Sequence, residues 1–296
     1  MDKAKSILSK LKNKSKQTGN SLQLHIQLFC QEEFLRRLSI SKYKEDFVLK
    51  GGLFIYLVTE FDSRPTIDMD FLLRNQSNSM NHILDMVEEI LSVETDNGFI
   101  KFEILKIEPI SVEKKYSGIS IHMIGKVGNT KTPINIDFGV GDIIVPNSEI
   151  RLIKTQLEDF EQVKINTYSL ESTIAEKFDA ILQRFELTSR MKDFYDIWYL
   201  ASCFEFDGDT LATAIEKTIK NRGTEYQKDS FERIIRLKDN EIILARWGVF
   251  VEKNKLPVEF GKIIEVIDIF IRDVADSKLD HEQFKKRWNP DELLWK

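Results

Sequence analysis

The chain has 296 residues, of which 42% are hydrophobic and 31% are charged, a composition typical of a globular protein that buries a substantial core. The formal net charge of −5 and the sequence pI of about 5.6 argue against an evenly basic surface for nucleic acid. No apolar run is long enough to cross a bilayer, and the N-terminus has no hydrophobic signal segment, so we expect a cytoplasmic protein that does not enter a membrane.

Helices alternate with strands in the first half of the chain, which predicts a mixed α/β sheet. The predicted elements, in order, are a helical region at 1–40, a strand at 47–50, a helix at 53–61, a strand at 66–73, a helix at 80–92, and strands near 99–108, 118–126, 133–138 and 162–168.

Strand patterns almost vanish from Ser169 onward, where Ser169 itself is a plausible helix N-cap. Helical periods recur at 171–187, 190–203, 209–220, 228–236, 239–252, 257–274 and 280–287. We therefore predict a bilobed α/β protein, with a mixed-sheet domain that includes the N-terminal helices over 1–168 and a helical domain over 169–296.

Two aspartates stand one residue apart in the predicted strand at 66–73. Alternate side chains of a strand share a face, so Asp68 and Asp70 point the same way, while Ile67, Met69 and Phe71 point into a core. Like charges at that distance repel unless a cation lies between them, and carboxylate oxygens suit Mg²⁺. A D-x-D on an amphipathic strand is also typical of a solvated face.

A glycine pair, Gly51-Gly52, separates the strand at 47–50 from the helix that follows. Such a turn offers backbone N–H groups to a phosphate, although a glycine pair is often only a turn. Together with the D-x-D it predicts a site for a nucleoside triphosphate and metal. Asp137, in a later strand, is a third candidate metal ligand, or a polar residue on the open face of its strand.

A second group of candidate residues lies in the predicted helices at 171–187 and 190–203. Lys177 and Arg184 are seven residues apart, which places both cations on one helical face, and Asp193 lies on the flank of an apolar stripe. The alternative is a solvated face on which Asp196 pairs with Lys192.

The motifs occur in a characteristic order. They are carried by Lys50-Gly51-Gly52, Arg64, Thr66, Asp68, Asp70, Asp137, Glu176-Lys177, Arg184 and the run from Arg190 to Trp198. This order, over roughly residues 47 to 200, resembles the AbiEii family of nucleotidyltransferases, which includes the MenT toxins.

The resemblance implies a polymerase-β-like nucleotidyltransferase domain followed by a helical domain, acting as the toxin of a toxin–antitoxin or abortive-infection (phage-defence) operon with a cognate antitoxin. Family members move a nucleotide from an NTP to an acceptor, which in MenT toxins is the 3′ end of tRNA. It also implies that Asp68 and Asp70 hold metal, that Lys177 grips the triphosphate, and that Asp193 acts as base or charge-positioning group. The family often has Gly-Ser where this chain has Gly51-Gly52.

The reaction requires an acceptor hydroxyl to attack the α-phosphorus while pyrophosphate leaves, with Mg²⁺ neutralising charge on the phosphate oxygens. Either Asp137 or Asp193 would accept or align the hydroxyl proton. Arg64 and Arg184 would contact phosphate or pair with a carboxylate. The candidate nucleotide-binding residues are Lys50, Gly51, Gly52, Arg64, Thr66, Lys177 and Arg184.

Positive charge is concentrated in two segments, a lysine-rich arm at residues 3–16 and a cluster at 217–238. Each is either an RNA-binding surface or a solvated helix face, and the arm is also a candidate antitoxin-docking element. From the family resemblance we expect transfer to tRNA or another RNA. The alternatives are transfer to a protein or small molecule, and an NTP-binding switch without catalysis.

Overall fold

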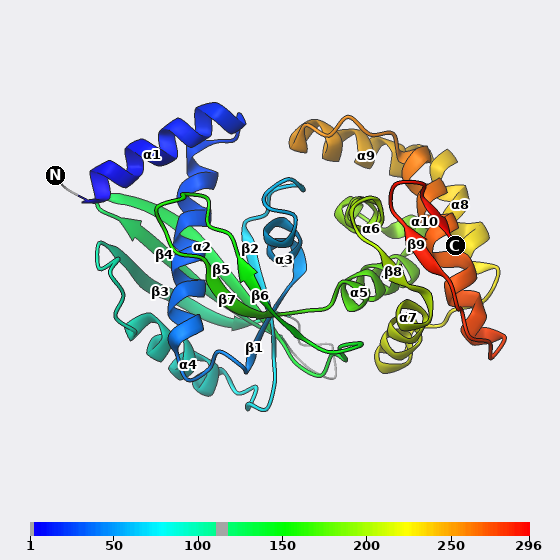
Figure 1. The fold of residues 1–296 in the computed structure, drawn as a ribbon, viewed down its shortest axis with the longest axis horizontal. Helices are drawn as coiled ribbons and strands as arrows, with labels where there is room; N and C mark the ends of the chain where they lie inside the picture. The colour runs from blue at the N-terminus through cyan, green and yellow to red at the C-terminus, as the bar shows by residue number, and fades with distance from the viewer. Residues whose placement is uncertain (1–2, 111–117) are drawn as a thin grey trace. The chain divides into compact units, whose positions relative to one another are not determined.

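The computed structural model describes residues 3–110 and 118–296 (Figure 1). The chain divides into two compact units: Met1–Gly141 with Glu149–Thr167, and Asp142–Ser148 with Tyr168–Lys296. The division predicted at 168/169 did not anticipate the short segment Asp142–Ser148, which packs with the second unit. There, Val145 N donates to Ser172 Oγ at 2.7 Å.

The helices of the first unit are α1 (Lys3–Thr18), α2 (Leu22–Ile40), α3 (Gly51–Val58) and α4 (Met80–Ser92). The helical region predicted at 1–40 is therefore two helices. Gly19 has a φ of 71°, which ends α1, and the Ser21 side chain caps α2 by accepting from Leu24 N at 3.2 Å.

Seven strands form one sheet within the described residues, in the order β3-β4-β5-β2-β1-β7-β6. They are β1 (Phe47–Lys50), β2 (Asp68–Leu73), β3 (Ile100–Pro109), β4 (Ile119–Val127), β5 (Thr130–Gly139), β6 (Glu149–Ile153) and β7 (Val163–Thr167). The pairs β2/β5 and β1/β7 are parallel and the others antiparallel, so the predicted mixed sheet is confirmed. The sequence did not predict β6, an edge strand whose Ile150 is 70% exposed.

One face of this sheet is apolar and is covered by α2 and α4 (Figure 1). Met69 and Phe71 are fully buried on that side, as predicted. The prediction for Ile67 is wrong: its side chain is 50% exposed, because Ile67 precedes β2 and only its carbonyl is fixed, by the side-chain amides of Gln27 and Gln31.

The second unit is mainly helical, as predicted. Its helices are α5 (Leu170–Leu182), α6 (Met191–Cys203), α7 (Gly208–Arg222), α8 (Ser230–Arg236), α9 (Glu241–Asn254) and α10 (Phe260–Leu279), with short 3₁₀ helices at Phe185–Leu187 and Leu237–Asp239. None of the helices in the described ranges is long and apolar enough to cross a membrane.

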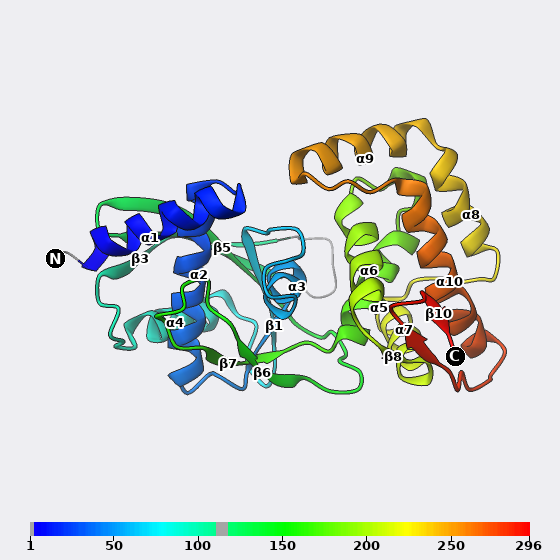
Figure 2. The ribbon, with the colours of Figure 1, turned by 45° about the horizontal axis from the view of Figure 1, so that its top comes forward.

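A small sheet, in the order β10-β9-β8, completes the second unit (Figure 2). Its strands are β8 (Phe206–Asp207), β9 (Arg287–Asn289) and β10 (Leu294–Trp295). The helix predicted at 280–287 does not form. Instead the chain turns so that Trp288 is buried against Phe270, and the indole N–H of Trp288 donates to the carbonyl of Ala201 at 2.6 Å.

Candidate active site

The strand register brings the predicted carboxylates of the first unit together. Asp70 on β2 is directly opposite Asp137 on the parallel strand β5, and it is also opposite Lys50 on β1. Asp68 lies two residues earlier on the same face of β2, opposite Asn135. A cation and two carboxylates therefore form one cross-strand row on the face away from the buried Met69 side chain.

Ser120 on β4 extends this row and was not predicted from the sequence. It is opposite Asp137, and its hydroxyl donates to Asp137 Oδ1 at 2.6 Å. A signal was present: the Gly128-Asn129 dipeptide is typical of a two-residue hairpin turn. Pairing outward from that turn places Ser120 opposite Asp137.

The glycine turn lies against the same row. Gly51 has a φ of 71°, and a Cβ at that position would be 2.0 Å from Asp70 Oδ2. A Cβ at Gly52 would lie 2.9 Å from Thr66 Oγ1 and 3.5 Å from Arg64 Nη2. The absence of side chains at the turn is therefore what lets the Asp70 carboxylate, the Thr66 hydroxyl and the Arg64 guanidinium approach the backbone.

The five nucleotide-binding candidates of the first unit consequently surround one short stretch of backbone. The Arg64 side chain is buried, which holds its guanidinium in place beside Gly52. The hydroxyl of Thr66 occupies the region into which a serine at position 52 would project. Although this chain lacks the serine of the Gly-Ser pattern, a hydroxyl still lies beside the turn, and Thr66, two residues before β2, supplies it.

The donor set of the row is suited to a hard cation. Asp70 and Asp137 stand on neighbouring parallel strands, whose axes are about 4.8 Å apart, so their carboxylates can approach one ion. In the described part of the chain, no group of three His, Cys, Asp or Glu side chains is arranged to hold a metal ion by itself. An ion there would complete its coordination with water and phosphate oxygens, which is the usual pattern for Mg²⁺.

The candidates of the second unit form a buried ionic cluster. Ser169 caps α5, as predicted, by accepting from Ser172 N at 3.0 Å. On α5, Lys177 Nζ donates to Asp196 Oδ2 at 2.5 Å and to Asp193 Oδ1 at 3.3 Å. The lysine side chain is only 10% exposed and both carboxylates are 1% exposed. The alternative pairing of Asp196 with Lys192 is therefore wrong.

Arg190 completes this cluster by donating from Nε to Asp193 Oδ2 at 2.5 Å. Burial raises the pKa of the Asp193 carboxyl, but the charges of Lys177 and Arg190 outweigh burial and hold that pKa below its ordinary value. A carboxylate with a lowered pKa is a weak proton acceptor. The geometry therefore favours a charge-positioning role for Asp193 over that of a general base.

Arg184 does not share a helical face with Lys177. The α5 helix ends at Leu182, and Arg184 is the residue before the 3₁₀ helix Phe185–Leu187. The seven-residue spacing that linked the two cations therefore does not apply, and the prediction of a shared face is wrong.

The basic cluster at 217–238 is partly neutralised by carboxylates of the same unit. Lys228 pairs with Asp280 at 2.7 Å and Arg233 pairs with Glu186 at 2.8 Å. These pairs reduce the charge that the cluster offers to a phosphate backbone.

The mixed sheet, with paired aspartates beside a glycine turn and a helical unit after it in the chain, is a fold shared with solved nucleotidyltransferase structures. Solved structures with similar folds include MenT4, a nucleotidyltransferase toxin from Mycobacterium tuberculosis, with a TM-score of 0.53 and 14% identity over 88% of this chain and 94% of that chain. JHP933 from Helicobacter pylori has a TM-score of 0.47 and 14% identity over 85% and 93% of the respective chains.

The sequence comparison identifies the family within this class. The family model described as nucleotidyl transferase AbiEii toxin, type IV toxin–antitoxin system, matches residues 33–266. The chain therefore belongs to the AbiEii family of nucleotidyltransferase toxins, whose toxin–antitoxin setting implies a cognate antitoxin. The predicted resemblance is confirmed. Among curated proteins, no sequence matches the chain.

Proposed function

We propose that this toxin transfers a nucleotide from an NTP to the 3′ end of an RNA, with tRNA as the acceptor, in a reaction that depends on Mg²⁺. The observation that carries the proposal is the row formed by Lys50, Asp70 and Asp137 beside the glycine turn. The resemblance to MenT toxins supports tRNA as the acceptor.

The first unit supplies the nucleotide-binding groups of the proposed reaction. Backbone N–H groups at Gly51 and Gly52 bind triphosphate oxygens, and the Arg64 guanidinium and Thr66 hydroxyl bind oxygens that reach the turn. Lys50 places a positive charge next to Asp70, where the α-phosphate would lie. Asp68 and Asp70 would hold Mg²⁺, which would supply charge neutralisation for the phosphate oxygens.

In the proposed transfer step, one bond forms and one bond breaks. The acceptor hydroxyl oxygen bonds to the α-phosphorus, the bond from that phosphorus to the bridging oxygen breaks, and pyrophosphate leaves. We propose that Asp137, which is opposite Asp70 in the strand register, accepts the hydroxyl proton or shares the ion. Ser120 fixes its Oδ1 atom and so orients the Oδ2 atom.

Lys177 is proposed to bind the triphosphate through the third N–H of its ammonium, since the other two donate to Asp193 and Asp196. Its ammonium is neutralised by Asp193 and Asp196 in this structure, and Arg190 balances the second negative charge. A phosphate oxygen would accept from the third N–H, while Asp193 and Asp196 keep orienting the ammonium. This role rests on the family resemblance.

The acidic charge balance favours a second candidate, transfer to a protein or small molecule. A net charge of −5 disfavours long-range attraction of RNA. The two candidates share the donor chemistry and differ only in the acceptor.

The test is incubation of the purified protein with total RNA, Mg²⁺ and each NTP in turn, labelled at the α- or the γ-phosphorus. We expect one NTP to place α-label in tRNA-sized bands, while its γ-label leaves as pyrophosphate. The α-label would appear in protein or in small molecules if the second candidate is right. Binding of the NTP without pyrophosphate release would contradict both and would favour the switch.

A further inference from the structure

Three lysines stand in one cross-strand row on the open face of the β3–β5 part of the sheet. Lys101 on β3 is opposite Lys126 on β4, which is opposite Lys131 on β5. Lys131 and Asp137 are six residues apart on one strand, so they project from the same face. This lysine row therefore shares a surface with the candidate active site.

The opposite face of these strands is the buried one. The Cys30 sulfur of α2 lies 2.8 Å from where a Cβ at Gly125 would be, so α2 covers the face to which residue 125 belongs. Lys126, the next residue of β4, projects to the other side. Lys101 and Lys131 are both exposed there, and the Lys126 side chain is 31% exposed.

Like charges directly opposite each other destabilise a sheet. One carboxylate reduces the repulsion: Glu103, on the same face, pairs with Lys126 at 2.5 Å. Within the described ranges, neither Lys101 nor Lys131 makes an ion pair. The row is thus left with an excess of positive charge, which an anionic ligand would neutralise.

The distance from the active site identifies the class of ligand. Six residues of β-strand separate Lys131 from Asp137, which is about 20 Å. A single bound nucleotide cannot occupy both places. A strand of a nucleic-acid helix, with one phosphate per roughly 3.4 Å of axis, spans the distance in about six nucleotides.

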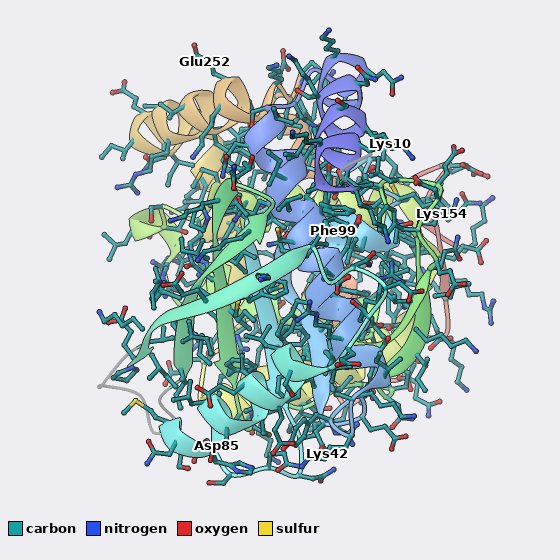
Figure 3. The ribbon with its side chains drawn as sticks, turned by 90° about the vertical axis from the view of Figure 1, so that its left-hand side faces the viewer. Lys10, Lys42, Asp85, Phe99, Lys154 and Glu252 are labelled. Carbon is teal, nitrogen blue, oxygen red and sulfur yellow. The ribbon has the colours of Figure 1, made fainter. Side chains whose placement is uncertain are left out.

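Further lysines adjoin the same end of the sheet. The Ala4 side chain of α1 lies 3.1 Å from where a Cβ at Gly128 would be, in the turn between β4 and β5. Lys3 Nζ lies 5.3 Å from the centre of the Phe99 ring, just before β3. Figure 3 shows α1, on which Lys10 is labelled, above this end of the sheet, marked by Phe99. Lys5, on the same helix, is also exposed.

We propose that the lysine row, Lys101, Lys126 and Lys131, binds the phosphate backbone of the RNA acceptor whose 3′ end is at Asp70 and Asp137. The inference rests on the proposed function and adds to it the surface that holds the acceptor. Lysine contacts to phosphate depend on charge, so the row would hold the RNA by its backbone without reading its bases.

The test compares two double variants of the full chain in binding to bulk tRNA over a range of salt concentrations. The first is Lys101→Ala/Lys131→Ala. The matched control is Lys44→Ala/Lys164→Ala, which removes two exposed lysines elsewhere on the first unit. Loss of two phosphate contacts should reduce the slope of log K against log salt by about 1.5 and weaken binding roughly tenfold near physiological salt. The control should match wild type.

Steady-state kinetics distinguish weaker binding of the acceptor from a general loss of folded structure. The lysine-row variant should show a raised KM for tRNA, with kcat and the KM for NTP unchanged and with Tm equal to or above wild type. Lys101→Arg/Lys131→Arg, which keeps both charges, should restore the KM for tRNA.

Two results would overturn the inference, and they are distinguishable. If wild type labels tRNA but the lysine-row variant has the salt slope and KM of the control, the inference fails and the proposed function stands. If wild type neither binds nor labels RNA, both fail together.

Discussion

Gly51→Ala provides a sharp test of the contact between the glycine turn and Asp70. The added methyl would lie 2.0 Å from Asp70 Oδ2, and ordinary contacts of a Cβ begin near 3.4 Å, so the carboxylate or the turn must shift by more than an ångström. A displacement of about 1 Å at a reacting centre costs on the order of 10²-fold in rate. We expect a loss of that size in nucleotide transfer.

The backbone contribution needs a matched control, because an alanine with positive φ costs about 1–2 kcal/mol by itself. Gly19 has the same φ of 71°, and nothing lies within 4 Å of a Cβ placed there. Gly19→Ala should therefore lose only the positive-φ cost in free energy of unfolding, which is less than the loss for Gly51→Ala, and it should keep wild-type transfer activity.

The assay measures urea unfolding of both variants, and then the rate of α-label transfer at a temperature where both are fully folded. A larger stability loss for Gly51→Ala, together with a large rate difference between the two folded variants, supports the contact. Equal rates for Gly51→Ala and Gly19→Ala would refute the reasoning, because Asp70 would then tolerate displacement.

Three further predictions concern a hydroxyl, a buried ion pair and a buried acid. Thr66→Val removes the hydroxyl beside Gly52 at nearly constant volume and should raise the KM for NTP several-fold; an unchanged KM in steady-state kinetics would exclude the hydroxyl from nucleotide binding. Lys177→Met leaves Asp196 buried without its cation and should lower the free energy of unfolding in urea by about 3–5 kcal/mol; no loss would show that the pair does not form in solution. Burial raises the pKa of Glu32 from 4.5 to about 8, so the folded protein holds the proton more tightly than the unfolded chain. The protonated Glu32 therefore stabilises the fold fully below pH 4.5. As the pH rises from 4.5 to 8, the free energy of unfolding falls by about 1.4 kcal/mol for each pH unit. Urea unfolding of Glu32→Gln across this pH range should lack that slope, and an identical pH profile would contradict the assignment.

Local sequence predicted the faces on which the site residues lie, because alternation is a local property. Met69 and Phe71 are buried and so turn Asp68 and Asp70 to the opposite face. The same alternation places Asp137 opposite its buried neighbours. The alternation of side chains along a strand is enough to predict these faces.

The local sequence pattern could not predict the order of the strands in the sheet. The alignment of Lys50, Asp70 and Asp137 requires β2 to lie between β1 and the distant β5, in a parallel pairing set by long-range packing. The position of Ser120 was accessible, in contrast, because the Gly128-Asn129 turn sets the register of the hairpin.

Tertiary contacts also decided where helix α5 ends. No glycine or proline follows Leu182, and the sequence pattern continues as if helical to 187. Phe185 instead has a φ of 41°, with the Arg233 guanidinium from α8 stacked 3.8 Å from its ring centre. Sequence periodicity cannot predict this contact between distant residues. Because α5 ends before Arg184, Arg184 and Lys177 do not lie on one helical face.

The most direct test of the central claim is transfer of α-label from an NTP to tRNA by Asp70→Asn, measured beside Asp85→Asn. Both substitutions remove one negative charge from the first unit, and Asp85 lies exposed on α4 (Figure 3). We predict that Asp70→Asn reduces transfer by roughly 10²-fold or more, while Asp85→Asn matches wild type. Equal transfer by the two variants would contradict a catalytic site at Asp70.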